Sequence, residues 1–149
     1  MQYTVKKPIN NNILRVVDPT GCELIVTGRG IGFGAKPGYK VDAEQVERSY
    51  RMTSPAVQKK LVEIPYEHLL LTDELVEDIR SRVHYPLNES LLITLADHIS
   101  FAIKRSEQGI RFSNPLMEPI REFYPEEYRL GMESLAKIRQ RCGADLSDD

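Results

Sequence analysis

The chain contains few of the residues from which disulfide frameworks and metal sites are built. Its 149 residues include two cysteines and three histidines. Cys22 and Cys142 lie far apart in the sequence, so neither a disulfide framework nor a cysteine-based metal site is expected. The histidines show no ligand spacing, and we predict no metal and no cofactor. Unpaired cysteines of this kind are typical of a reducing compartment, which predicts a cytoplasmic protein.

Long apolar runs are also absent. A membrane-spanning helix needs roughly 20 consecutive apolar residues, and no stretch of this sequence approaches that length. The N-terminal stretch MQYTVKKPIN does not resemble a signal peptide. The sequence therefore predicts no membrane insertion.

Complete nucleotide-binding signatures are missing too. Gly30-x-Gly32-x-x-Ala35 formally matches the dinucleotide fingerprint and follows a predicted strand. That fingerprint must open a helix, whose N-terminus holds the pyrophosphate, whereas the chain continues here with Lys-Pro-Gly, which ends regular structure. The sequence contains neither the Gly-Lys-Ser/Thr of a P-loop nor a kinase-type lysine strand. We therefore expect that the protein is not an enzyme.

The net charge of −2 is divided unevenly along the chain. Residues 1–58 carry eight basic and five acidic side chains, a net +3, which leaves −5 for the remainder. A basic first part joined to an acidic second part fits an anion-binding module attached to another module.

Residues 1–52 predict a small antiparallel sheet. Strands are expected at 3–7, where Pro8 ends the strand, at 13–17 and at 23–27, with a type I turn at 18–21 and a loop at 34–39. Residues 46–52 alternate like a strand, although Asp42-x-x-Gln45 resembles a helix capping box. A sheet of about four short strands has a poor core of its own, so we expect a homodimer.

The stretch from Gly28 to Phe33 (GRGIGF) is unusual for a core strand. Alternate glycines weaken a strand and let another backbone approach closely. Arg29 suits phosphates and base edges, and the ring of Phe33 offers a flat surface for a nucleobase. The stretch also fits a bulged hairpin with a surface arginine and a core phenylalanine. The residues by themselves leave both interpretations open.

The triplet Asn10-Asn11-Asn12 has two interpretations as well. Asparagine clusters are typical of turns, but asparagine also hydrogen-bonds to base edges. Beside a basic first strand and the Gly-Arg-Gly stretch, the triplet indicates a nucleic-acid face.

The chain after Ser54-Pro55 predicts helices only. Thr72-Asp73-Glu74 is expected to cap one helix, and Asn88 a longer one that ends before Gln108-Gly109. Two further helices are expected over 116–141, around Pro125. The long helix carries a wide apolar stripe formed by Leu91, Leu92, Leu95, Ile99, Ala102 and Ile103.

The chemical candidate of the helical part is Asp97-His98. His98 lies at the edge of the apolar stripe, where a lone histidine is more often a structural residue. His68 and His84 have no ligand spacing with it, so a metal site is not expected.

Three blocks of the first part, in their order and spacing, resemble the co-antiterminator RNA-binding domain of BglG/SacY-type transcriptional antiterminators. They are Ile9–Asn12, Glu23–Val26 and Gly28–Phe33, and the resemblance covers nearly all of residues 1–55. It implies a four-stranded antiparallel sheet, with the fourth strand at 46–52, that works as a symmetric dimer. Such a dimer grips an imperfect RNA hairpin in the leader of a sugar-utilisation transcript and prevents the terminator from forming.

The RNA contacts implied by the resemblance fall on Lys7, Asn10, Asn12, Gly28, Arg29 and Phe33. Each residue type suits its role. Lysine and arginine pair with phosphates, asparagine binds base edges or sugar hydroxyls, glycine allows close approach, and phenylalanine stacks. Pro8 lies inside the matched region and is expected to shorten the first strand.

Residues 56–149 resemble the phosphotransferase-system regulation domain that follows in the same antiterminators. The resemblance implies that His98 accepts phosphate from the sugar phosphotransferase relay, with Asp97 shaping its environment. The donor would be a sugar permease component or a phosphocarrier. The matching residues are Leu87-Asn88-Glu89, Asp97-His98-Ile99-x-Phe101-Ala102-Ile103-x-Arg105, Gly109, Asn114-Pro115-Leu116 and Tyr128-x-x-Gly131.

The sequence departs from this family pattern at its end. The family module continues into further helices that carry a second phosphorylatable histidine, and a second copy of the module follows. This chain stops at Asp149. We therefore expect a fragment or a natural truncation, with the regulation domain incomplete at its C-terminus and part of its apolar stripe exposed.

Together these features predict an α+β multidomain protein: a small four-stranded antiparallel β-sheet RNA-binding domain at 1–55, then an all-α helical bundle at 56–149. The predicted function is antitermination on a leader-RNA hairpin, regulated by histidine phosphorylation. One alternative is a DNA-binding repressor with a helical effector domain, but the basic part has no helix-turn-helix. Another is a phosphotransferase that uses His98 as a covalent carrier, but it would lack a nucleotide site and a second catalytic group.

Overall fold

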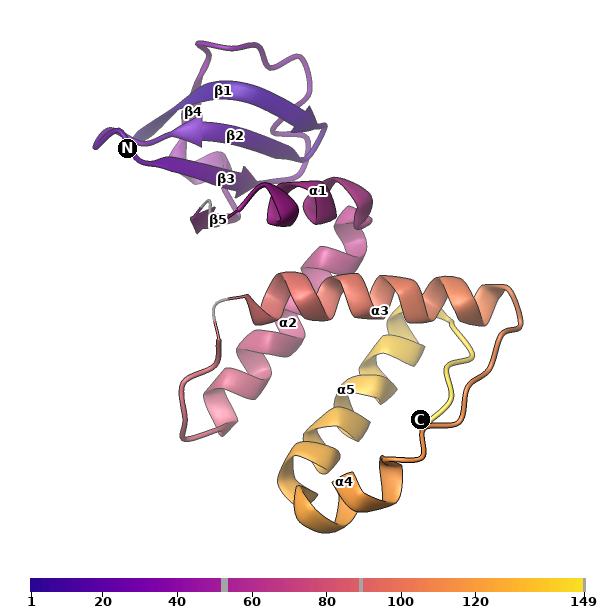
Figure 1. Cartoon of the computed structure of the whole chain (residues 1–149). Coiled ribbons are helices and arrows are strands. Elements are labelled where there is room, and N and C mark those ends of the chain that lie inside the picture. Colours follow the sequence, from indigo (N-terminus) through magenta and orange to yellow (C-terminus); the bar gives the residue numbers. More distant parts are fainter. Residues whose placement is uncertain (52–53, 89, 149) are drawn as a thin grey trace. The chain divides into compact units, whose positions relative to one another are not determined.

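The computed structural model describes residues 1–51, 54–88 and 90–148 and divides into two compact units. The first unit, Met1–Glu63, holds the β-sheet and helix α1 (Pro55–Glu63), and the second, Ile64–Asp149, is helical (Figure 1). An antiparallel sheet followed by helices confirms the predicted α+β class.

The sheet has five strands, so the prediction of four was wrong. All neighbouring strands pair antiparallel in the order β4-β1-β2-β3-β5. The unforeseen strand, β4, is three residues long and pairs with residues 2–4 of β1. It follows a stretch rich in glycine and proline and is too short to show an alternating pattern. The strands are β1 (Gln2–Asn10), β2 (Ile13–Val17), β3 (Glu23–Thr27), β4 (Lys40–Asp42) and β5 (Arg48–Arg51).

Pro8 lies inside β1, opposite Leu14. The prediction that Pro8 ends the first strand was therefore wrong. The pairing of β1 with β2 shifts register on either side of Pro8, between Val5 and Lys7 and again between Pro8 and Asn10. Strand β4 reaches only as far as Thr4, so β1 is an edge strand at Pro8. Proline is tolerated in edge strands and at bulges, because its missing N–H group is not needed there.

The segment after β4, whose sequence indicated both a helix start and a strand, contains a helical turn followed by a strand. Residues Ala43–Gln45 form a single 3₁₀ turn, in which the side-chain oxygen of Gln45 accepts the backbone N–H of Asp42 at 3.2 Å. Strand β5 follows at Arg48–Arg51, inside the range 46–52 implied by the family resemblance. Met52, the last residue of that range, lies outside the described residues.

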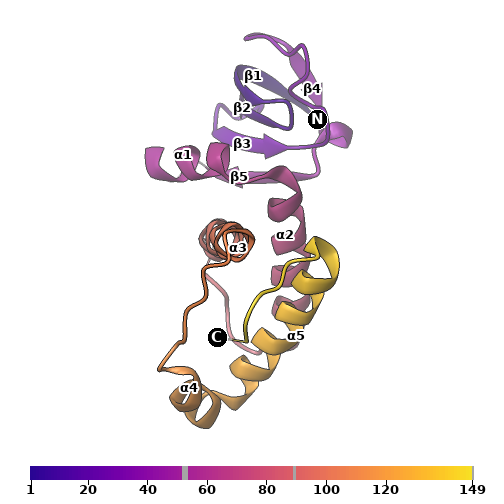
Figure 2. The same cartoon turned by 90° about the vertical axis from the view of Figure 1, so that its right-hand side faces the viewer.

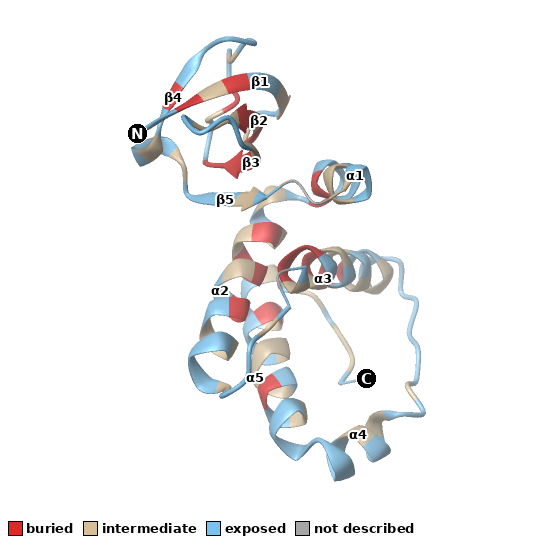
Figure 3. Cartoon of the chain, turned by 60° about the vertical axis from the view of Figure 1, so that its left-hand side comes forward, coloured by how far each residue is buried: buried red, intermediate tan, exposed pale blue. Residues whose placement is uncertain are grey.

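Buried side chains occur at successive positions along the central strands, and Figure 3 marks buried residues in red on β2 and β3. Leu14 and Val16 contribute to one core cluster, while Ile13 and Ile25 alternate with core residues along their strands and are also fully buried. Ile31 and Ala35, from the glycine-rich segment after β3, pack against the same cluster. That segment is therefore anchored on the sheet. The cluster consists of Tyr3, Val5, Leu14, Val16, Val26 and Val41.

The helical unit contains four helices in its described residues, and one of them begins earlier than predicted. Thr72 lies in the middle of α2, not at its start, and its hydroxyl donates to the carbonyl of His68 at 2.7 Å. A threonine that bonds back one turn is compatible with a helix interior, so the Thr-Asp-Glu sequence gave a false start signal. The helices are α2 (Tyr66–Arg82), α3 (Leu91–Glu107), α4 (Met117–Phe123) and α5 (Pro125–Cys142).

Other helix boundaries agree with the sequence more closely. Helix α3 ends before Gln108-Gly109, and two helices flank the Tyr124-Pro125 junction, as predicted. Asn88 lies three residues before α3, where its side chain accepts the backbone N–H of Ser90 at 2.8 Å. No helix in the described part of the chain is long and apolar enough to cross a membrane.

Helices α2 and α5 lie side by side and are joined by a ladder of ion pairs (Figure 2). Successive rungs advance by four residues on α2 and recede by four on α5, as antiparallel helices require. The middle rung joins Lys137 to Asp78 at 2.9 Å. The three rungs are Glu74–Arg141, Asp78–Lys137 and Arg82–Glu133.

This ladder predicts a loss of stability in acid. The hydrogen bond from Arg82 lowers the pKa of Glu133 below its ordinary 4.5, and that from Lys137 lowers the pKa of Asp78 below 3.8. A carboxyl with a lowered folded pKa stabilises the protein above its unfolded pKa, and this stabilisation disappears as the pH falls through the folded pKa. The urea midpoint of the helical signal should therefore fall below about pH 4.5 in the native chain, and fall less in Glu133→Gln.

The matched control is Glu118→Gln, because Glu118 forms its ion pair with Arg121 inside α4. This variant should keep the native pH dependence. An acid loss of equal size in the native chain and in Glu133→Gln would contradict the role assigned to the ladder.

Candidate nucleic-acid interface and phosphoacceptor histidine

Two turns at one end of the sheet are joined by three hydrogen bonds. The turn Asn10–Asn12 connects β1 to β2, and the segment 28–34 follows β3. The N–H groups of Gly28, Gly30 and Gly32 donate to the carbonyl of Asn12, the side-chain oxygen of Asn12 and the carbonyl of Asn11, at 3.0, 2.8 and 2.9 Å. Every second residue of the segment is thus attached to the asparagine turn, which matches the alternation of its glycines.

Two of these glycines are required by close contact inside the protein. A Cβ atom on Gly32 would lie 2.0 Å from the carbonyl oxygen of Asn10, and one on Gly28 would lie 2.3 Å from that of Gln45. Both residues are buried. Gly30 has a different requirement: its φ of +70° is a left-handed conformation that glycine adopts without strain. The pattern in the sequence therefore encodes the shape of this turn pair.

Two of the residues that alternate with the glycines, Arg29 and Phe33, are exposed to solvent. Phe33 is 81% exposed, so the interpretation of Phe33 as a core residue was wrong. Arg29 is exposed, and its backbone N–H donates to the carboxylate of Glu47 at 3.2 Å. Sequence reasoning missed Gly32 and Glu47 as parts of this site. The alternation of glycines was a signal for the first, but no local pattern pointed to the second.

Both site asparagines use their side-chain oxygens within the turns. The oxygen of Asn10 accepts the backbone N–H of Asn12 at 2.9 Å, and the oxygen of Asn12 accepts that of Gly30. Their NH₂ groups remain as donors. Lys7 is exposed on β1, opposite Arg15, and lies outside the hydrogen-bonded turns. The structure therefore brings the other five predicted RNA-binding residues into one turn pair and places Lys7 further along β1.

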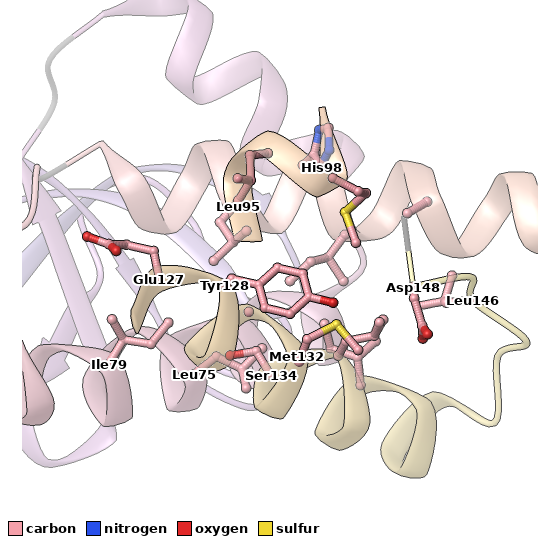
Figure 4. Close-up of a pocket in the computed structure, with 17 residues that line it drawn as sticks. Leu75, Ile79, Leu95, His98, Glu127, Tyr128, Met132, Ser134, Leu146 and Asp148 are labelled. Atoms are coloured by element: carbon pink, nitrogen blue, oxygen red, sulfur yellow. The ribbon is translucent and has the colours of Figure 1, made fainter. Parts of the chain in front are cut away.

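His98 is exposed on α3, while its neighbour Asp97 is half-buried. It stands at the rim of an apolar cavity of about 370 Å³ (Figure 4). Leu95 from α3 faces Tyr128 and Met132 from α5 across this cavity. An exposed imidazole at a rim is accessible to another protein, as a phosphoacceptor has to be.

The other two histidines have different surroundings. The Nδ1 atom of His68 lies 2.9 Å from the hydroxyl of Ser100, which links α2 to α3, and burial lowers the pKa of His68. His84 is exposed in the connection between α2 and α3. Within the described residues, no three histidine, cysteine or acidic side chains gather in a way that could hold a metal ion.

The contact beneath Gly32 generates a stability prediction. Gly32→Ala should destabilise the sheet unit by more than Gly34→Ala, because its Cβ would collide with the backbone of Asn10. Gly34 has a φ of +68° with open space around its Cβ position, so alanine there should cost only the roughly 1–2 kcal/mol of a left-handed conformation. Urea unfolding followed by the amide signals of the sheet measures both. Equal costs would show that the close contact at Gly32 is not needed.

The chain matches two family models and several known proteins. Residues 3–59 match the CAT RNA binding domain and residues 73–149 match the PRD domain. Transcription antiterminator LicT of Bacillus subtilis (strain 168) is 33% identical over 149 residues, covering 97% of this chain and 54% of LicT. The beta-glucoside operon antiterminator of Dickeya chrysanthemi is 32% identical, covering 97% and 53%.

The fold is also similar to a solved structure. The crystal structure of GlcT CAT-PRDI has a TM-score of 0.77 and 30% sequence identity, and the match covers 99% of this chain and 90% of that one. This chain spans about half the length of the two antiterminators above. With both family models matched in order and the fold shared over nearly its whole length, the chain belongs to the family of transcription antiterminators that join a CAT RNA binding domain to a PRD domain.

Proposed function

We propose that this protein is an RNA-binding antiterminator, which as a homodimer binds a hairpin in the leader of a sugar-utilisation transcript and keeps the terminator from forming. Residues 1–55 are the RNA-binding module and residues 56–149 the regulatory module, and both act in the cytoplasm. The observation that carries the proposal is the turn pair, which holds an exposed arginine and an 81% exposed phenylalanine on a rigid, glycine-dependent backbone.

Each residue of the turn pair has a chemical role in this proposal. The ring of Phe33 stacks on an unpaired base, and Arg29 pairs with a phosphate or a base edge. The NH₂ groups of Asn10 and Asn12 donate to acceptors on bases or sugars, because their oxygens are already engaged within the turns. Gly28 has no side chain, so the segment packs closely against the backbone of Gln45. This close packing leaves room for the RNA backbone to approach the turn pair.

Lys7 and the homodimer extend this surface. Lys7 contacts phosphates beside the turn pair and contributes to the +3 charge of residues 1–58. A dimer doubles that charge, and sequence-independent affinity for RNA grows with the number of phosphates that are neutralised. It also presents two turn pairs to one hairpin, so control of dimerisation is control of RNA binding.

Phosphorylation of His98 by the sugar phosphotransferase system supplies that control. A phosphoryl group adds about 1.5–2 negative charges at the rim of the apolar cavity. Glu127 also lines this cavity, as does Asp148, which is paired with Arg139 at 2.7 Å, so the phosphoryl group adds to carboxylate charge already present around the cavity. Like charges at a helix interface alter packing, and altered packing shifts the population of dimers that are able to bind RNA. Asp97, the half-buried residue before His98, shapes the environment of the His98 imidazole.

The exposure of Phe33 predicts an effect on binding without an effect on stability. Phe33→Leu should weaken hairpin binding by about 1–3 kcal/mol, the value of one stacked base, while the melting temperature barely changes. The control is Tyr39→Leu, which removes another exposed ring, 52% exposed, from the same unit. Hairpin affinity and thermal melting are measured on both variants. Normal affinity in Phe33→Leu would remove Phe33 from the RNA face.

The exposed position of His98 predicts the site of labelling. Incubation with the phosphorelay proteins should attach one acid-labile phosphate to the native chain and to His84→Ala, and none to His98→Ala. His84 is the appropriate control because its side chain is also exposed. Label that persists in His98→Ala would assign the phosphate to another histidine.

A further inference from the structure

A guanidinium that contacts two phenylalanine rings lies on the same face of α3 as His98, two helical turns further along the helix. The Cζ atom of Arg105 is 5.0 Å from the ring centre of Phe101 and 4.8 Å from that of Phe112. Phe101 is 58% exposed and Phe112 is 60% exposed. We call Phe101, Arg105 and Phe112 the aromatic–arginine cluster.

The end of α3 explains how the cluster forms. Gly109 has a φ of +70° and its N–H donates to the carbonyl of Ser106, while the N–H of Ile110 donates to that of Arg105. These two bonds are the Schellman motif, which ends a helix and reverses the chain. The chain after Gly109 therefore turns back toward the last turn of α3, and Arg111 is fixed there by an ion pair with Asp145. Phe112 thus lies against Arg105.

The cluster continues the surface on which His98 lies. His98, Phe101 and Arg105 are spaced three and four residues apart on α3, so they are neighbours along one helix face. The opposite face carries the buried side chains of the helix. A protein that approaches the exposed ring of His98 along this face therefore meets Phe101 one turn further on and Arg105 one turn beyond that.

We propose that the aromatic–arginine cluster is the docking surface for the protein that donates phosphate to His98. This inference rests on the proposed phosphorylation of His98. The partner has an apolar centre that covers the two rings and a carboxylate that pairs with Arg105. Arginine and aromatic residues are the side chains enriched at the energetic centres of protein interfaces.

The lack of a polar partner for the Arg105 side chain within the described residues supports this assignment. Its Nε atom is buried and has no hydrogen-bond partner, and no ion pair to Arg105 is found within the described residues. The two rings hold the guanidinium in place without neutralising its charge. A half-buried, unneutralised arginine that is held by two rings is well suited to a carboxylate on another protein, because little side-chain entropy remains to be lost on binding.

The transfer step balances without a further reactant. A ring nitrogen of His98 attacks the phosphorus, a P–N bond forms, and the bond between phosphorus and the carrier atom of the donor breaks. The imidazole of His98 releases one proton, which passes to the carrier atom of the donor. The cluster takes no part in this chemistry and acts only by positioning the donor.

The experiment compares two phosphate donors on the full chain. Phosphoramidate is too small to need a docking surface, whereas the donor protein needs one. The double variant Phe101→Ala/Phe112→Ala should lose at least about tenfold in labelling rate at low concentrations of the donor protein. Its labelling by phosphoramidate should be unchanged, which also shows that His98 is still accessible. The control is Phe123→Ala, since Phe123 is a 71% exposed phenylalanine on α4.

The charge of the cluster has its own test. Arg105→Gln should slow labelling by the donor protein and weaken its dependence on salt, because the ion pair with the donor is removed. Equal rates for the native chain and the double variant with the donor protein would overturn the docking surface. So would a double variant that loses dimerisation but keeps its labelling rate. If neither donor labels the native chain at His98, the proposed phosphorylation itself fails.

Discussion

The RNA-binding unit depends on three hydrogen bonds between the glycine-rich segment and the asparagine turn. They are possible because Gly28 and Gly32 have no side chain: an added Cβ would lie within 2.3 Å of a backbone oxygen in either case. The same bonds occupy the oxygen of Asn12 and fix the segment on which Arg29 and Phe33 stand. In the proposed function these bonds preorganise the recognition of RNA, since they hold the backbone of both turns before RNA binds.

In the helical unit, the proposed phosphorylation requires that one of three histidines is accessible to a donor protein. His68 is half-buried and hydrogen-bonded to Ser100, whereas His98 is exposed at the cavity rim. The ion-pair ladder joins α2 to α5, and the aromatic–arginine cluster lies on the face of α3 that carries His98. The proposed specificity thus comes from the surroundings of His98, which is exposed beside the aromatic–arginine cluster, whereas His68 is half-buried and hydrogen-bonded.

Much of this architecture could be predicted from the sequence, because its strongest signals are local. The alternate glycines predicted that residues 28–33 leave ordinary strand structure and let another backbone approach closely, and Gly109 predicted the end of α3. Non-local features could not be predicted in this way. Strand β4 exists only through its pairing with β1, Pro8 is tolerated because β4 stops short of it, and Thr72 gave a cap signal inside a longer helix. The contact of Phe112 with Arg105 likewise depends on a reversal of the chain.

The most direct test of the central claim is an amide NMR titration of the full chain with a leader-RNA hairpin. The account predicts that the largest shifts fall on residues 10–12 and 28–34, and that the N–H groups of Gly28, Gly30 and Gly32 are already protected from hydrogen exchange without RNA. Shifts that concentrate on β4 and β5, or glycine amides that exchange freely before RNA is added, would contradict it.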